Sequence, residues 1–249
     1  MITVVKNDEK GLIRTFDSLL SQTFKNWELI IVAGYSSDAT LERGKQMESQ
    51  DKRVTFLLED SPGIYNAMNQ GVLAARSDLV WFMNAGDCFF SNRVIARSIE
   101  IFKIMATDLI VGGHVVKSKN SFLEYNFSKR HFGQVNFAFN RRYGCHQSML
   151  FRKNKIIDLG LFDLSFTYAS DYDLVLKMIA EVKGFRDNQI YSLIEPGGAA
   201  DSNLYKVHQE KYVIRNKNLE FLGAKILSYI WMKMACLKLS LRSKLPRRE

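Results

Sequence analysis

The chain has 249 residues, of which 47% are hydrophobic and 24% are charged, so it can bury a sizeable core and is not a disordered protein. The formal net charge of +9 leaves three partner classes open: nucleic acid, an anionic membrane, or a small molecule that carries phosphate. Much of the positive excess lies in the C-terminal part of the chain, which argues against a nucleic-acid surface in the front half.

Cysteine usage and the chain's apolar runs bear on its location. The spacing of Cys88, Cys145 and Cys236 fits neither a disulfide framework nor a zinc site, which predicts a reducing, cytosolic compartment. The opening "MITVV" already has the pattern of a strand, so we expect no signal peptide. No apolar stretch is long enough and free enough of charge to span a bilayer.

In chain order, the front half alternates strands with helices. Uninterrupted apolar runs predict strands over 2–5, 27–33, 54–59 and 78–83. Apolar residues at helical spacing predict helices over 12–24, 38–50, 64–75 and 92–105. Ser36, Ser37 and Asp38 are candidate caps for the second helix. Strands that are apolar on both faces imply a parallel sheet covered by helices.

The back half is less regular. Its patterns predict strands within 108–127 with a turn near Lys119 and Asn120, and then a strand over 146–151, a helix over 170–182, a strand over 184–195 and a helix over 203–221. Since no Pro-, Gly- or Ser-rich linker interrupts the chain, we expect one mixed sheet whose back half adds a second wall to a ligand site in the front half.

The C-terminal segment 224–242 alternates large apolar residues with Lys and Arg in helical register. Trp231 and Tyr229 are suited to a headgroup interface, and the basic side chains to anionic lipid. An amphipathic helix that packs on the protein's own core has the same pattern, so both interpretations stay open.

Small and polar residues gather where the predicted front-half strands end. The fourth strand is followed by "NAGD" at 84–87, and the third by "EDSPGIYNAMNQG". Open α/β sheets bind ligands at this edge, and the composition suits a nucleotide. No Walker loop or GxGxxG fingerprint is present. Asp87 is a candidate ligand for a divalent metal beside a diphosphate, or alternatively the cap of a turn.

Four stretches carry a family resemblance across residues 2–178: the first two strands with "SSDAT", the segment from "GIYNAMNQG" to "NAGD", "CHQSMLFRK", and "ASDYDLVLKM". In these the chain resembles the family-two, GT-A-type glycosyltransferases, and more narrowly the bacterial capsule and exopolysaccharide (colanic-acid-type) group. The resemblance implies an α/β, Rossmann-like GT-A fold with a mixed, mostly parallel sheet. We expect a glycosyltransferase domain over 1–221, with a nucleotide-sugar half over 1–105 and an acceptor-side half over 106–221, and a basic amphipathic membrane-associating tail over 222–249.

The resemblance also implies roles for individual residues. Asp87 would hold a divalent metal, Mn²⁺ or Mg²⁺, and the donor diphosphate. Asp171, preceded by Ser170 in place of the family's usual Glu, would be the catalytic base, although a carboxylate at that position also caps a helix and loses basicity there. The sugar or acceptor side is assigned to His146, Gln147 and Asp173. The nucleotide-sugar site is assigned to Val4, Asn7, Gly34, Tyr35, Pro62, Gly63, Asn66, Asn69, Asn84, Ala85 and Gly86.

The chain departs from the family pattern by losing carboxylates. Ala33 and Asn66 stand where Asp is expected, and Asn84 replaces a common acid of the acidic motif. Fewer carboxylates imply weaker metal binding, or another ligand such as His208. Tyr35 could compensate at position 33 by stacking on a base.

These observations predict an inverting glycosyltransferase that moves a sugar from a nucleotide-sugar donor, a UDP-sugar for preference, to a lipid-linked glycan acceptor in surface polysaccharide biosynthesis. It would work at the cytoplasmic face of the cell membrane. The alternative is a non-catalytic or low-activity nucleotide-sugar-binding partner of another glycosyltransferase. A nucleic-acid-binding protein is poorly supported, since no helix-turn-helix, zinc or RNP pattern is present.

Overall fold

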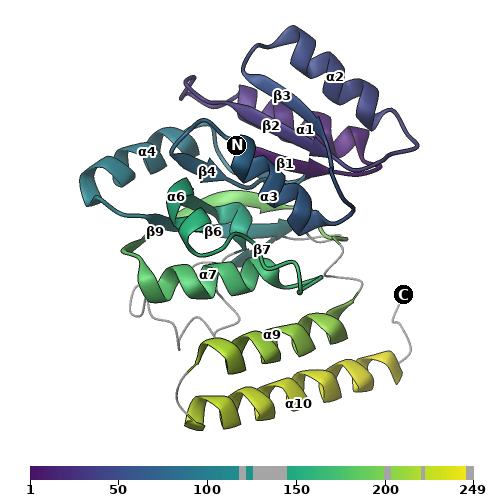
Figure 1. Ribbon diagram of the computed structural model, residues 1–249, viewed down its shortest axis with the longest axis vertical. Helices are drawn as coiled ribbons and strands as arrows, with labels where there is room; N and C mark the ends of the chain where they lie inside the picture. The colour runs from purple at the N-terminus through teal and green to yellow at the C-terminus, as the bar shows by residue number, and fades with distance from the viewer. Residues whose placement is uncertain (118–121, 126–144, 199–202, 220–221, 245–249) are drawn as a thin grey trace.

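A computed structural model describes residues 1–117, 122–125, 145–198, 203–219 and 222–244. Helices cover a central sheet, and the last two helices lie side by side at one end of the molecule (Figure 1). The three cysteines are free thiols. Within the described part of the chain, no helix is both long and apolar enough to cross a membrane.

The predicted front-half elements are confirmed, with shifts of a few residues at their ends. The strands are β1 (Ile2–Val5), β2 (Leu29–Ala33), β3 (Val54–Leu58) and β4 (Leu79–Trp81). The helices are α1 (Glu9–Leu20), α2 (Thr40–Gln50), α3 (Ile64–Ala74) and α4 (Val94–Met105). β1, β2 and β3 pair in parallel.

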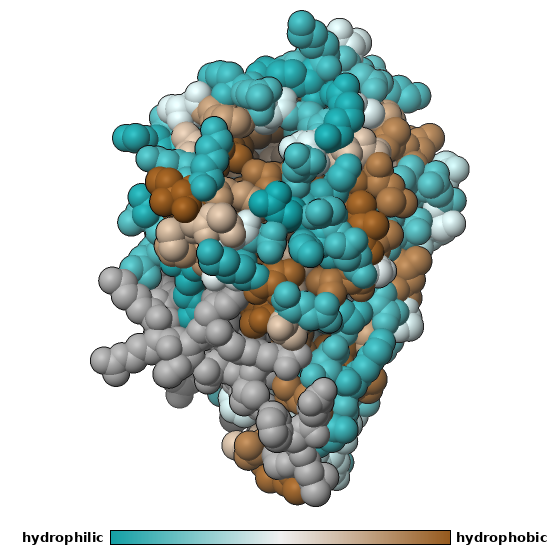
Figure 2. All heavy atoms as spheres, turned by 60° about the vertical axis from the view of Figure 1, so that its left-hand side comes forward, coloured by the Kyte–Doolittle hydropathy of each residue, from teal (hydrophilic) through white to brown (hydrophobic). Residues whose placement is uncertain are grey.

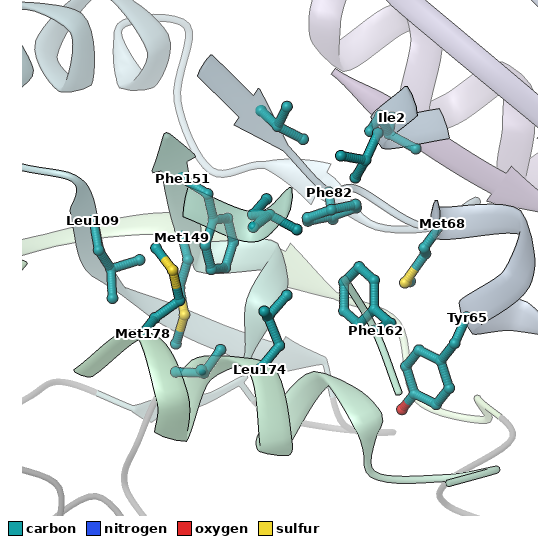
Figure 3. Close-up of a cluster of buried hydrophobic side chains, with 14 of the residues drawn as sticks. Ile2, Tyr65, Met68, Phe82, Leu109, Met149, Phe151, Phe162, Leu174 and Met178 are labelled. Atoms are coloured by element: carbon teal, nitrogen blue, oxygen red, sulfur yellow. The ribbon is translucent and has the colours of Figure 1, made fainter. Parts of the chain in front are cut away.

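Each central strand is buried on both faces, as its continuous apolar run predicted. Ile2 and Val4 face the layer formed by α3, α6 (Lys153–Asp158) and α7 (Ser170–Glu181), while Val5 faces the layer of α1, α2 and α4. Figure 3 shows the first of these layers, in which Phe82, Phe151 and Phe162 pack among Ile2, Met68 and Leu174. The two layers hold the strand ends rigidly in place.

A second sheet combines β4 and β5 (Cys88–Phe89) of the front half with four strands of the back half: β6 (Leu109–Lys117), β7 (Phe122–Tyr125), β8 (Met149–Arg152) and β9 (Gly184–Ile194). Their order is β4-β8-β6-β9-β5, with β7 on β6, and a parallel bridge between Ile2 and Phe82 joins them to β1. Only the β6–β9 pair among the pairings of this second sheet is parallel, so parallel pairing concentrates in the front half. The chain thus has the expected α/β fold with a mixed sheet.

Two details differ from the sequence prediction. His146–Ser148 form a turn of 3-10 helix, η1, and the strand begins only at Met149, because the backbone N–H of Ser148 bonds back to Cys145. β5 and α6 were not predicted, since elements of two and six residues are too short to show a period. The turn predicted near 119–120 lies outside the described residues.

Helix α9 (Leu204–Asn218) packs on α7, and the tail forms helix α10 (Leu222–Lys244), which packs on α9. Arg215 of α9 donates through Nε to Ser228 Oγ of α10 at 2.8 Å, and Ser228 and Ala235 are buried. The other side of α10 exposes large apolar side chains. One face of the amphipathic tail therefore packs on the protein, and a second face does not.

Candidate active site

Residues from both halves meet at one edge of the sheet because of strand direction. The segment 84–87 follows β4, and residues 145–148 precede β8, which runs antiparallel to β4. The end of one strand therefore lies beside the start of the other. Glu195 follows β9, and Asp171 lies in the first turn of α7. Together these segments enclose a cavity of about 570 Å³.

The turn 84–87 wraps around one buried hydroxyl group. Thr15 Oγ1 of α1 donates to the carbonyl of Asp87 at 2.7 Å, and accepts from the backbone N–H of Gly86 at 3.0 Å. Gly86 adopts φ = +97°, a conformation that side chains disfavour. Thr15 and Gly86 therefore explain why a carboxylate can follow directly after a buried strand and still face the cavity.

The Asp87 carboxylate lies at the base of this cavity and is 5% exposed. Its Oδ2 accepts from Gln147 Nε2 at 2.9 Å, and its Oδ1 accepts from the backbone N–H of Glu195 at 3.0 Å. Burial raises the pKa of Asp87 from 3.8 to about 6, and these two hydrogen bonds oppose the rise. A raised pKa in a cavity lining is typical of functional carboxylates, so Asp87 is a candidate by its environment as well as by its position.

Asp171 faces the same cavity. Its Oδ1 accepts from the Tyr65 hydroxyl at 2.9 Å, and its Oδ2 lies 3.0 Å from His146 Nδ1. Burial raises the pKa of Asp171, but the bond and charge of His146, the nearby charge of Lys211 and the Tyr65 bond outweigh it and bring the pKa to about 2. Asp171 is therefore ionised at neutral pH.

Helix α9 positions the start of α7. The Glu210 carboxylate accepts hydrogen bonds from the backbone N–H groups of Thr167, Tyr168 and Ala169, at 2.8 to 2.9 Å. These residues immediately precede the turn that carries Asp171. Burial lowers the pKa of Lys211, the next residue on α9, while the charge of Asp171 raises it. The second wall of the site thus depends on a helix far along the chain.

The predicted site residues divide into three groups, of which the first lines the cavity. Asn84, Ala85, Gly86, Asp87, His146, Gln147 and Asp171 all line the cavity. Asn84 Nδ2 lies 3.5 Å from His146 Nε2, so the amide and the imidazole bridge the space between the two carboxylates.

Three predicted residues serve the fold instead. Val4 is a core side chain whose carbonyl accepts from Ala85 N–H. Asn69 is buried and bonds through both ends of its amide to the backbone of Phe162. Asp173 is fully buried, pairs with Lys177 and accepts from Asn218, so it points away from the acceptor side. All three were assigned to ligand binding from their place in a motif, and packing decided otherwise.

The remaining predicted residues lie at the same sheet edge but outside the cavity lining. Asn7 and Gly34 follow β1 and β2, and Asn7 Oδ1 accepts from Ser37 N–H at 2.8 Å. Tyr35 is exposed, and Ala33 is buried with no polar side-chain atom to offer a base. Pro62 and Gly63 are exposed ahead of α3, and Asn66 is half-buried in its first turn. Their assignment to the nucleotide stays a prediction.

Sequence reasoning missed several lining residues. Tyr65 lies within a quoted motif, but its helical spacing alone does not show that its hydroxyl reaches Asp171. Arg14 and Glu195, which form an ion pair at the cavity, are 181 positions apart. Among these, only Asp8, the N-cap of α1 shortly after β1, had a visible signal, which was its place beside Asn7.

Comparison with known proteins shows which family the chain belongs to. Residues 1–160 match the family described as Glycosyl transferase family 2. An uncharacterised glycosyltransferase of Mycobacterium tuberculosis is 28% identical over 187 residues, which cover 71% of this chain and 67% of that protein. A PGL/p-HBAD biosynthesis glycosyltransferase of the same species is 26% identical over 163 residues, covering 65% of this chain and 61% of that protein.

Solved structures share the fold at low sequence identity. Staphylococcus aureus TarS 1–349 in complex with UDP superimposes with a TM-score of 0.68 at 15% identity, covering 90% of this chain and 68% of that one. The mannosyltransferase PcManGT from Pyrobaculum calidifontis, in complex with GDP-Man and Mn²⁺, gives 0.69 at 12% identity, covering 99% and 75%. These are GT-A folds. The chain belongs to glycosyl transferase family 2 and is a glycosyltransferase.

Proposed function

We propose that this glycosyltransferase transfers a sugar with inversion from a nucleotide-sugar donor to a lipid-linked glycan acceptor in surface polysaccharide biosynthesis. The observation that carries the proposal is that Asp87 and Asp171 open onto one cavity, with Asn84, His146 and Gln147 between them. The solved relatives bind UDP or GDP-Man in the same fold. A UDP-sugar is the donor we would test first, and Asn7, Gly34 and Tyr35 are suited to hold its base and ribose.

A divalent cation fits the residues at the base of this cavity. Among the described residues, the lining carries four carboxylates and a single Lys or Arg, so a diphosphate needs positive charge there. Two buried amide oxygens beside Asp87, Asn84 Oδ1 and Gln147 Oε1, have no hydrogen-bond partner among the described residues. Carboxylate and amide oxygens are ligands for Mg²⁺ and Mn²⁺, and substrate phosphates complete such sites. The bound metal would neutralise the leaving diphosphate.

No complete protein cage is present, since the described residues contain no group of three His, Cys, Asp or Glu side chains able to hold a metal. Asp87, Asn84 and Gln147 would therefore hold the metal only together with the donor. This matches the loss of carboxylates that the sequence shows.

Asp171 is suited to be the base. The acceptor O–H gives its proton to the Asp171 carboxylate while its oxygen bonds to the anomeric carbon, and the bond from that carbon to the diphosphate oxygen breaks. Because the base and the leaving group lie on opposite sides of the sugar, the configuration inverts. With a pKa of about 2, Asp171 accepts the proton late, after the hydroxyl has become acidic by bond formation. His146 and Tyr65 hold both of its oxygens in place meanwhile.

Substitution Asp171→Asn tests this function. We expect nucleoside diphosphate release from a donor and a lipid-linked acceptor to fall about 10²- to 10⁴-fold, the usual worth of a general base. The dissociation constant for the nucleoside diphosphate should stay unchanged. Asp163→Asn is the control, because Asp163 pairs with Lys217 outside the cavity. Donor binding by the wild type without turnover of any sugar would instead favour the non-catalytic, partner-binding alternative.

The exposed face of α10 would place the enzyme on the inner face of the cell membrane. Figure 2 shows apolar side chains at the lower end of the molecule, where Figure 1 places α9 and α10. Lys225, Lys233 and Lys238 are exposed on the same helix, which suits anionic lipid. The large apolar residues exposed on α10 are Ile226, Leu227, Tyr229, Ile230, Met234 and Leu237.

Vesicle sedimentation tests the membrane contact. The protein should bind phosphatidylglycerol vesicles in low salt, more weakly in high salt, and should not bind duplex DNA. The double variant Leu227→Glu, Ile230→Glu should stay in solution. Leu164→Glu, on an equally exposed leucine outside α10, should bind as the wild type does. Equal binding of both variants would contradict the proposal.

A further inference from the structure

One carboxylate at the mouth of the cavity holds two cations. Glu195 Oε1 accepts from Arg14 Nη1 at 2.5 Å and from Lys117 Nζ at 2.9 Å. Arg14 comes from α1, and Lys117 ends β6, which runs parallel to β9 with Val116 opposite Ile194. Three separate elements thus bring these charges together, beside the turn that carries Asp87.

Arg14 lies over that turn. A Cβ added at Gly86 would be 4.0 Å from Arg14 Nη2 and 3.9 Å from Glu195 Cβ. The backbone N–H of Glu195 donates to Asp87 Oδ1, so the carboxylate that holds Arg14 and the carboxylate suited to metal are adjacent. The guanidinium is therefore next to the position that a diphosphate held at Asp87 would occupy.

The Arg14 guanidinium has unused hydrogen-bonding capacity. Of its five N–H groups, only one on Nη1 bonds to a side chain among the residues that the structure describes, and the side chain is 45% exposed. A guanidinium fork matches two phosphate oxygens at once. Arg14 is also the single Lys or Arg among the described residues that line the cavity.

We propose that Arg14 binds the donor's diphosphate, and that Glu195 holds its guanidinium in position before the donor binds. This inference rests on the proposed function and names a contact within it. When Arg14 turns to the phosphate oxygens, Glu195 keeps Lys117 as its partner and no unpaired carboxylate faces the incoming anion. Lys117 thus keeps Glu195 paired when Arg14 leaves it. The permanent positive charge of Arg14 supplements a metal site that has lost carboxylates.

Calorimetric titration in EDTA tests the proposal without turnover. The probes are UDP, GDP and dTDP, and the nucleoside of each is titrated separately for comparison. The diphosphate that binds the wild type is then used with the variants. Arg14→Ala should weaken that diphosphate about 10- to 100-fold, the worth of one charge-assisted hydrogen bond or two. Affinity for the nucleoside should not change. Arg14→Lys keeps the charge but loses the fork, so its affinity for the diphosphate should lie between those of the wild type and Arg14→Ala.

Arg97→Ala is the matched control, because Arg97 is equally exposed and forms an Arg–carboxylate pair with Asp187 outside the cavity. It should bind the diphosphate as the wild type does. If Arg14→Ala binds the diphosphate normally, or weakens diphosphate and nucleoside alike, the role of Arg14 is wrong while the proposed function stands. If the wild type binds no nucleoside diphosphate even when Mn²⁺ is added, both fail.

Discussion

Substitution Glu210→Ala should separate the positioning of the base from the binding of the donor. Glu210 accepts from three consecutive N–H groups ahead of α7. The amide of Thr167 is exposed and water can replace its partner, but those of Tyr168 and Ala169 are partly buried. At about 1–2 kcal/mol each, their loss should lower the free energy of unfolding by about 2–4 kcal/mol. For a chain of this size that lowers Tm by about 5–15 °C.

The catalytic effect should exceed the effect on binding. Without Glu210 the turn that carries Asp171 is free to shift, and a displacement of about 1 Å at a reacting group can cost about 10²-fold in rate. We therefore expect kcat to fall at least about 10-fold at a temperature where the variant is folded. Affinity for the nucleoside diphosphate should stay the same, because Thr15, Gln147 and the backbone of Glu195 hold the Asp87 side.

Glu28→Ala is the control for this measurement. Glu28 accepts from the backbone N–H groups of Arg76 and Ser77 and from the Arg76 side chain, the same chemistry in a loop away from the site. It should keep its kcat and lose less stability in urea unfolding than Glu210→Ala, because its three hydrogen bonds are exposed and water can replace them. Equal losses of kcat in the two variants, or a Glu210→Ala protein as stable as the wild type, would refute the reasoning.

Three further predictions concern the turn 84–87, the buried amide of Asn69, and the stability of the fold at acid pH. Gly86→Ala should weaken nucleoside diphosphate binding in calorimetry and lower the free energy of unfolding by about 1–2 kcal/mol, because a side chain strains φ = +97°. The control Gly160→Ala, at φ = +88° outside the cavity, should lose the same stability and bind the diphosphate normally. Asn69→Ala should cost about 2–4 kcal/mol in urea unfolding by leaving the buried Phe162 N–H and C=O unpaired, whereas Asn66→Ala should cost no more than about 1 kcal/mol, because half-buried Asn66 bonds only to the carbonyl of exposed Ser61, where water can replace it. The pKa of Asp171 is lowered to about 2, so its ionised form stabilises the fold above about pH 3.8, and this contribution, about 2 kcal/mol, is lost as the pH falls from 3.8 toward 2. The stability difference between wild type and Asp171→Asn should therefore shrink over that range, and a difference that does not depend on pH would contradict the assignment.

Local sequence could predict some of the residues that line the cavity but not others. Asn84, Gly86 and Asp87 could be placed from the chain alone, because an apolar run followed by small and polar residues marks a strand end at the ligand-binding edge. Asn69 and Asp173 come from equally good motifs, yet the structure buries them against Phe162 and Lys177. Whether a polar side chain on a helix faces ligand or core depends on what packs above it, and spacing does not contain that information.

The amino-acid sequence by itself determined the alternation of strands and helices, the family, and the edge of the sheet where chemistry collects, because these follow from short-range apolar periodicity and contiguous motifs. Only the tertiary structure decided that β8 runs antiparallel to β4 and so sets His146 beside Asn84, that Glu210 holds the turn of Asp171, and that Glu195 gathers Arg14 and Lys117. These contacts join residues far apart in the chain. They depend on strand direction and helix docking, which the whole core determines together.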